Sequence, residues 1–184
     1  MLCSGGAGLD LGVKLAVPGA RTVCWVEWEA FACAELVRRM ETGELDAAPL
    51  WTDLRTFDGK PWRGAVDCVI GGFPCQPHST AGKRRGEDDE RNLWPDVRRI
   101  VEEVRPSVVF FENVPGLVSV HGGRFFRTLL EDLEGLGFAV ATDCFTASEV
   151  GASHKRERLF ILGIAGDAKR RQDGAANRSG KRRK

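Results

Sequence analysis

The sequence has no long apolar run, and none of its hydrophobic stretches approaches the roughly 20 residues that a helix needs to cross a bilayer. Its first residues, MLCSGGAG, lack the basic segment and apolar stretch of a secretory signal. The six cysteines form no CxxC pair and have no histidine placed to complete a zinc site. We therefore expect a cytoplasmic protein with reduced thiols, no membrane partner and no metal.

Length and charge suggest one folded domain followed by a basic tail. The 184 residues suffice for one α/β domain but are few for two. Residues 167–184 hold eight Lys/Arg and two Asp, a net charge of +6, whereas residues 1–166 carry a net charge of −5. The tail has almost no large apolar side chain, so we expect it to be unfolded. Two readings stay open for it, a solvated end and a phosphate-binding arm.

The hydrophobic pattern alternates between strand and helix without an internal repeat. We predict strands over residues 22–26, 66–70, 107–111, 138–145 and 158–164, and helices over 29–40, 93–104 and 125–136. This alternation is typical of βαβ units and predicts an α/β domain over residues 1–166.

A glycine-rich turn, SGGAGLDLG, opens the sequence. Gly6, Gly8 and Gly12 are spaced G-x-G-x-x-x-G, one residue longer than a dinucleotide-binding fingerprint. Glycines at such a turn let the backbone approach a ligand just before a helix begins. A tight turn without a ligand explains the same residues, so this motif alone is weak.

Three side chains that follow the glycine turn in the sequence indicate an adenosine-containing cofactor. Glu27 ends a predicted strand 19 residues after Gly8, where a carboxylate can accept both hydroxyls of a ribose. Trp28 offers a flat apolar face for adenine, and Asp53 can accept from the adenine amino group. The glycine loop has no Lys or Arg to read phosphates, which favours S-adenosylmethionine over NAD or ATP.

A second turn, GGFPCQPHS over residues 71–79, follows a buried strand. It places Cys75 at the carboxyl end of the sheet, where open α/β folds bind ligands, between Pro74 and Pro77. A free thiol has a pKa near 8.5, so nucleophilic attack at neutral pH needs local stabilisation of the thiolate. Most cysteines are simply small buried apolar residues, but the FPCQ context favours a nucleophile here.

The chain resembles the C5-cytosine DNA methyltransferase family through motifs in the family's order: SGGAG, VEWE, TDL, GGFPCQPHS, RNLWPD, FFENVPG and SHKRERLFILG. These motifs cover residues 2–165. The resemblance implies a Rossmann-like S-adenosylmethionine-dependent methyltransferase sheet with helices on both faces. It also implies double-stranded DNA as partner and a prokaryotic or phage source.

Cytosine carbon 5 is too weak a nucleophile to attack a methyl sulfonium, but a thiolate added at carbon 6 makes carbon 5 an enamine carbon. By resemblance Cys75 is this thiolate, and Glu112 holds a proton near ring nitrogen 3. Arg158 contacts the base carbonyl, and Arg156 supports the cysteine side of the pocket. We expect both arginines on one face of a strand.

The resemblance also implies two sets of contacts. Cofactor contacts are expected from Cys3, Ser4, Gly5, Gly8, Leu9, Glu27, Trp28, Asp53, Leu54, Pro74 and Leu93, with Trp94 covering the cofactor beside Leu93. Nucleic-acid contacts are expected from Gln76, Ser79, Lys83, Arg84 and Arg85, in a loop over residues 79–92 that closes on a flipped base.

The match departs from the family at both ends. Most of the family's first strand is absent before Cys3, and Ala7 stands where glycine is common. The chain ends before the family's target-recognition domain and final helix, so we expect a truncated catalytic domain. Two alternatives stay open: an inactive or split-enzyme fragment that needs a second polypeptide for recognition, and a tRNA cytosine-5 methyltransferase.

Overall fold

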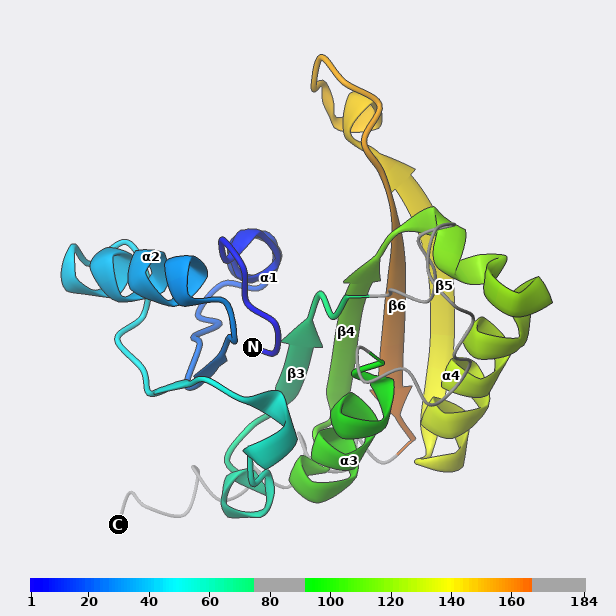
Figure 1. The fold of residues 1–184 in the computed structure, drawn as a ribbon, viewed down its shortest axis with the longest axis horizontal. Coiled ribbons are helices and arrows are strands. Elements are labelled where there is room, and N and C mark those ends of the chain that lie inside the picture. Colours follow the sequence, from blue (N-terminus) through cyan, green and yellow to red (C-terminus); the bar gives the residue numbers. More distant parts are fainter. Residues whose placement is uncertain (75–91, 167–184) are drawn as a thin grey trace, which may run out of the picture.

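The computed structural model describes residues 1–74 and 92–166, which form a mixed sheet flanked by helices (Figure 1). β1 (Trp25–Val26) pairs in parallel with β2 (Leu50–Trp51), and β3 (Cys68–Gly71) pairs in parallel with β4 (Val108–Asn113). The last strand, β6 (Glu157–Ala165), runs antiparallel to β4 on one side and to β5 (Phe138–Thr146) on the other. The hydrogen-bonded order of the larger sheet is therefore β3-β4-β6-β5.

A single residue, Leu2, connects the two groups of strands. It forms parallel bridges with Val26 of β1 and with Gly71 of β3. Its amide donates to the Ile70 carbonyl at 2.8 Å. A β-carbon on Gly71 would lie 2.9 Å from the Leu2 carbonyl oxygen, so only glycine allows this approach. Leu2 thus stands where the family resemblance places the first strand.

Two helices, α3 (Trp94–Val104) and α4 (Arg124–Gly135), cover one face of the sheet. The buried residues of α3 recur every three or four positions, as an amphipathic helix requires. They pack with the buried Leu129 and Leu133 of α4 against Val109 and Phe111 of β4. This layer forms the main core.

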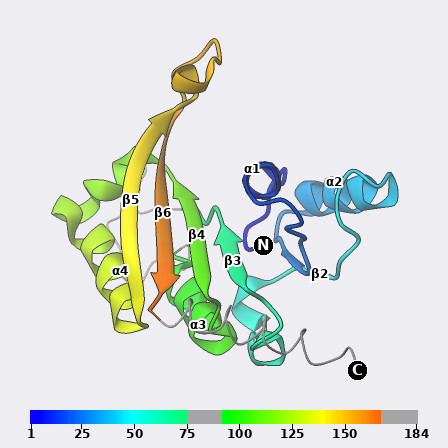
Figure 2. The same cartoon turned by 180° about the vertical axis from the view of Figure 1, so that it is seen from behind.

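Among the residues that the structure describes, those near β1 cover the opposite face. Trp25 and Val26 are adjacent in β1, so their side chains point to opposite faces. Val26 belongs to the main core, whereas Trp25 packs with Ala7 and with Leu36 of α2 (Ala30–Glu41). α1 (Gly8–Ala16) lies beside α2 (Figure 2). Helices on both faces confirm the predicted fold class.

Local pattern predicted most elements to within a few residues. The main difference is the predicted strand 22–26, which shortens to Trp25–Val26 because the Thr22 amide donates to Asp46 instead of to a neighbouring strand. No range was predicted for the helix α1, for the short strand β2, or for η1 (Leu54–Thr56), a single turn of 3₁₀-helix. Within the described ranges, no helix combines the length and apolarity needed to cross a membrane.

Candidate active site

The carboxyl ends of the parallel strands meet at one edge of the sheet, where a cavity of about 380 Å³ opens. Seven of the expected cofactor residues line it: Cys3, Glu27, Trp28, Asp53, Leu54, Pro74 and Leu93. Val26, Glu29 and Arg55 also line it and were not predicted. Each of these three is a sequence neighbour of a predicted residue, which is the signal that could have found them.

Glu27 is buried at the end of β1 and organises one wall of the cavity. Its Oε2 accepts from the Gly5 amide at 2.7 Å, and its Oε1 accepts from the amides of Trp28 and Glu29, both at 2.9 Å. A carboxylate offers about four acceptor positions. With three of them used, roughly one remains for a ribose hydroxyl. This geometry differs from the predicted pairing with both hydroxyls.

The glycine turn does not line the cavity; its Gly5 amide holds the Glu27 carboxylate in place. Ser4 is buried, and its hydroxyl bonds the carbonyls of Met1 and Val26. Gly8 and Leu9 begin α1 and are not part of the cavity wall. Ala7 precedes the helix with φ 58°, a left-handed conformation that explains why glycine would suit this position.

Two side chains on the cavity wall have the chemistry expected for an adenine site. Trp28 is 70% exposed, so its ring face is available to a ligand. Asp53 caps the short helix η1, where its Oδ1 accepts from the Arg55 amide at 2.9 Å. Leu54, the next residue, is buried against the main core. The cavity lining thus combines an exposed aromatic ring (Trp28), a hydrogen-bond acceptor (Asp53) and an apolar side chain (Leu54).

The described cysteines are not activated. Burial, followed by the charge of Glu27, raises the pKa of the Cys3 thiol to about 12. Burial also raises the pKa of Cys68 to about 11 and increases the thiol pKa values of Cys24, Cys33 and Cys144. All five are neutral near pH 7, so none of them is the nucleophile expected by the mechanism.

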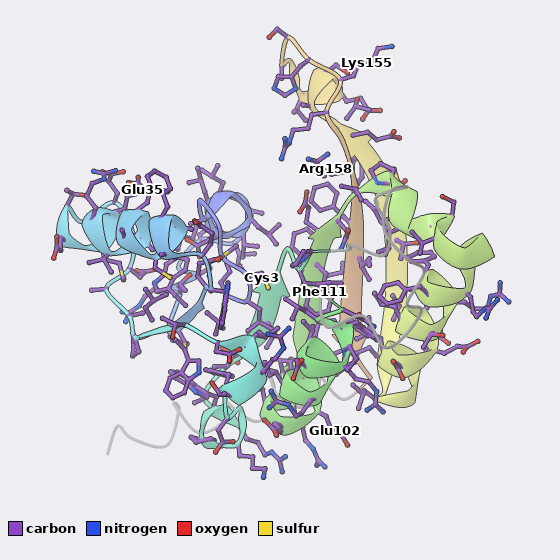
Figure 3. All side chains as sticks on the ribbon, in the orientation of Figure 1. Cys3, Glu35, Glu102, Phe111, Lys155 and Arg158 are labelled. Atoms are coloured by element: carbon purple, nitrogen blue, oxygen red, sulfur yellow. The ribbon has the colours of Figure 1, made fainter. Side chains whose placement is uncertain are left out.

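A charged pair lies where β4 ends, against the segment that leads to Pro74 on the cavity wall. Nε of Arg158, on β6, is 2.7 Å from Oε1 of Glu112, on β4. The other carboxylate oxygen of Glu112 faces Gly72, where an added β-carbon would lie 3.2 Å away. Gly72 begins the segment that leads through Pro74 to Cys75. In Figure 3, Arg158 lies beyond the end of β4, whereas Glu102 of α3 lies at the opposite end of the sheet.

Asn113 ties the same segment to β4. Its buried side-chain amide donates to the Phe73 carbonyl at 3.0 Å. The Phe73 ring packs at 5.6 Å from Trp94 and 5.7 Å from Phe111. Trp94 is buried, and its indole N–H donates to Asp132. It therefore packs into the core and does not line the cavity, whereas the preceding Leu93 does.

Arg156 differs from its expected placement. β6 begins at Glu157, so Arg156 precedes the strand and does not share a strand face with Arg158. Its carbonyl accepts from the Ala147 amide, which closes the turn that projects beyond the sheet between β5 and β6 (Figure 1). The remaining expected residues lie outside the described ranges: Cys75, Gln76, Ser79, Lys83, Arg84 and Arg85.

Comparison with known protein families identifies the family of this chain. The sequence profile of the C-5 cytosine-specific DNA methylases matches residues 1–183. The chain belongs to this family. It is 36% identical to the type II methyltransferase M.PspPI of Psychrobacter sp. (strain TA137) over 90% of the chain and 39% of that relative. M1.ScrFI of Lactococcus lactis subsp. cremoris is 44% identical over 73% of the chain and 37% of its own length.

Solved structures of other methyltransferases share the fold. A protein described as a DNA modification methyltransferase encoded within an E. coli prophage superposes with a TM-score of 0.72 at 26% identity, over 91% of this chain and 46% of that one. DNMT2 of Spodoptera frugiperda superposes with a TM-score of 0.71 at 21% identity, over 90% and 49% of the two chains. The chain thus spans about half or less of the length of these relatives.

Proposed function

We propose that this chain transfers a methyl group from S-adenosylmethionine to carbon 5 of cytosine in double-stranded DNA. The observation that carries the proposal is the position of the Glu112–Arg158 pair against Gly72, two residues before Pro74, which lines the cavity. The pair and a cofactor-sized cavity therefore both adjoin the segment that leads to Cys75. Membership in the C-5 cytosine-specific DNA methylases supports this assignment.

The cavity suits the cofactor in size and chemistry. Its volume of about 380 Å³ falls within the range of roughly 300–1,000 Å³ usual for small-molecule sites. Glu27 would hold the ribose, while Trp28 and Asp53 would hold the adenine by stacking and by accepting from its amino group. The bound cofactor supplies an electrophilic methyl group on a sulfonium, and the absence of Lys or Arg from the glycine turn fits a ligand without phosphates.

In the proposed mechanism, Cys75 adds as a thiolate to carbon 6 of a base that has left the helix. Glu112 holds a proton at ring nitrogen 3, so the electrons released by the addition make carbon 5 nucleophilic. Arg158 keeps the Glu112 carboxylate in place and can donate to the base carbonyl. After methyl transfer, a base takes the carbon 5 proton and the carbon–sulfur bond breaks, so that the thiolate returns. The proton on ring nitrogen 3 goes back to Glu112, which leaves neutral 5-methylcytosine.

A trapping assay tests the proposal. The purified chain is incubated with labelled S-adenosylmethionine and mixed-sequence DNA in which cytosine is replaced by 5-fluorocytosine. Since fluorine cannot leave as a proton does, the complex stays covalent. We expect a protein–DNA adduct that disappears in Cys75→Ser, whereas cofactor affinity changes little. A large loss of cofactor affinity in Cys75→Ser would instead assign this turn a structural role.

The same assay separates the remaining alternatives. Transfer to RNA in place of DNA would favour a tRNA methyltransferase. No adduct with either nucleic acid, in a chain that still binds the cofactor, would favour a catalytic part that needs a second polypeptide for recognition.

A further inference from the structure

We infer that Arg99, on α3, is a positioning residue that sets the preference of the cavity for adenine. The inference rests on the proposed cofactor site and adds to it a residue outside the cavity wall. Arg99 acts through η1, the 3₁₀ turn that presents Asp53 and Leu54 to the cavity.

The guanidinium of Arg99 caps the carboxyl end of η1. One terminal nitrogen donates to the Phe57 carbonyl at 2.8 Å, and the other donates to the carbonyls of Leu54 at 3.1 Å and Arg55 at 3.2 Å. Within the turn, the Leu54 carbonyl accepts from the Phe57 amide at 3.3 Å. The Arg99 side chain adds hydrogen bonds to three carbonyls from a different element, 42 to 45 residues away.

Two carboxylates hold the guanidinium in this position. Glu103 lies 3.2 Å away and Asp96 lies 3.5 Å away, both on α3. Glu103 also accepts from the Gly59 amide at 2.8 Å, which ties the following loop to the same helix. Because the guanidinium is planar and rigid, its direction is determined by these partners.

The opposite end of η1 is held by Asp53, whose Oδ1 accepts from the Arg55 amide. The turn is thus fastened at its start by Asp53 and at its end by Arg99. If Arg99 is removed, the backbone of residues 54–57 can shift, and the Asp53 carboxylate shifts with it. We expect the hydrogen bond from the adenine amino group to Asp53 to weaken, while the cavity itself stays intact.

This consequence can be measured by comparing two ligands that differ only at the purine. S-adenosylhomocysteine carries an amino group at purine position 6, whereas S-inosylhomocysteine carries an oxygen that the Asp53 carboxylate repels. Titration calorimetry with the whole chain gives the dissociation constant of each ligand and hence the preference. We expect Arg99→Met to reduce the preference by about threefold to tenfold, the worth of one hydrogen bond. Arg99→Lys, which cannot span three carbonyls, should reduce it as well.

Arg98 provides a matched control on the same helix. Its guanidinium pairs with Asp132 and Glu102, and its side-chain exposure of 41% is close to the 35% of Arg99. Arg98→Met should leave the preference unchanged, and Asp53→Ala should reduce it as Arg99→Met does. Circular dichroism checks the fold, and Arg99→Lys replaces Arg99→Met if the latter does not fold.

The outcomes separate this inference from the proposed function. If the wild type binds neither ligand, the proposed cofactor site falls and this inference falls with it. If the wild type prefers S-adenosylhomocysteine and the Arg99 variants weaken both ligands equally, the cofactor site stands and Arg99 has only a structural role.

Discussion

At the scale of single residues, the arrangement at the end of β4 accounts best for the expected chemistry. Glu112 and Asn113 are adjacent, so they point to opposite faces of the sheet. Glu112 meets Arg158 on one face, and Asn113 reaches the Phe73 carbonyl on the other. Two consecutive side chains thus serve two different needs. In the proposed mechanism the first acts on the base, and the second fixes the backbone that leads to Cys75.

Because Glu112 and Arg158 form an ion pair, we expect substitution of either residue to impair catalysis without impairing cofactor binding. Glu112→Gln removes the charge and Arg158→Met removes its partner, so each should lower the rate of methyl transfer by roughly 100-fold while cofactor affinity changes little. The double variant should be less impaired than the product of the two single effects, because both remove one interaction. Single-turnover methylation and calorimetric titration with S-adenosylhomocysteine measure the two quantities.

The control for this cycle is Glu102→Gln, which removes one partner of the exposed Arg98–Glu102 pair at the opposite end of the sheet. It should leave the transfer rate unchanged. Independent, fully multiplicative effects of Glu112→Gln and Arg158→Met would contradict a shared role.

At the scale of elements, α1 is attached to the rest of the domain mainly through charge. Lys14 lies 2.8 Å from the buried Asp10 and 2.7 Å from Asp46, and the Thr22 amide also donates to Asp46. Burial opposes the charge of Lys14, but hydrogen bonds to the two carboxylates outweigh it and raise its pKa. α1 therefore keeps its position with little apolar packing; Leu11 and Leu15 remain exposed.

This attachment predicts a pH-dependent stability. The hydrogen bond from Lys14, followed by that from Thr22, lowers the pKa of Asp46. A lowered carboxyl pKa contributes stability above the unfolded value of about 3.9, and this contribution is lost as the pH falls through the folded pKa. Lys14→Met removes the cation that Asp46 and the buried Asp10 share, and it should cost about 3 kcal/mol at pH 7. The difference from wild type should shrink below about pH 4.

Urea denaturation at a series of pH values measures this difference. Arg38→Met is the comparison, because Arg38 forms its ion pairs on the exposed face of α2. It should change the stability little at any pH. A Lys14→Met deficit that stays constant from pH 7 to pH 3 would contradict the proposed role of Asp46.

At the scale of the whole molecule, the charge divides between two regions. We propose a catalytic domain over residues 1–166 with a net charge of −5, followed by a basic segment over 167–184 with a net charge of +6. The second region lies outside the described residues. An acidic domain repels the phosphate backbone of DNA, so the basic segment should supply a large part of the non-specific affinity.

Deletion of residues 167–184 tests this division. Because affinity for duplex DNA depends on salt through the number of phosphates neutralised, the deletion should weaken binding and flatten the plot of log affinity against log salt concentration. Fluorescence anisotropy with a labelled duplex at several salt concentrations measures both effects. Affinity for S-adenosylhomocysteine should not change. If the deletion does not alter the salt dependence, residues 167–184 do not contact DNA phosphates and are only a solvated end.

The sequence by itself determined the α/β class, most helices and strands, and seven residues of one cavity wall. These depend on local pattern and on motifs that place residues at the ends of strands. Glu27 could be assigned to the site because it ends a predicted strand, and the carboxyl ends of parallel strands meet at one edge. Asp53 was proposed for its acceptor chemistry, and Pro74 was expected from the resemblance. The family resemblance assigned Glu112 and Arg158 to the same base, but their direct contact was not predicted and only the structure shows it.

Only the tertiary structure decided which groups satisfy one another across the chain. It showed Leu2 connecting β1 to β3, the acceptor positions of Glu27 occupied by amides, and Trp94 turned into the core. It also revealed Arg99 capping η1 from more than 40 residues away. Hydrogen bonds of this kind depend on how elements pack, and packing leaves no periodic trace in the sequence.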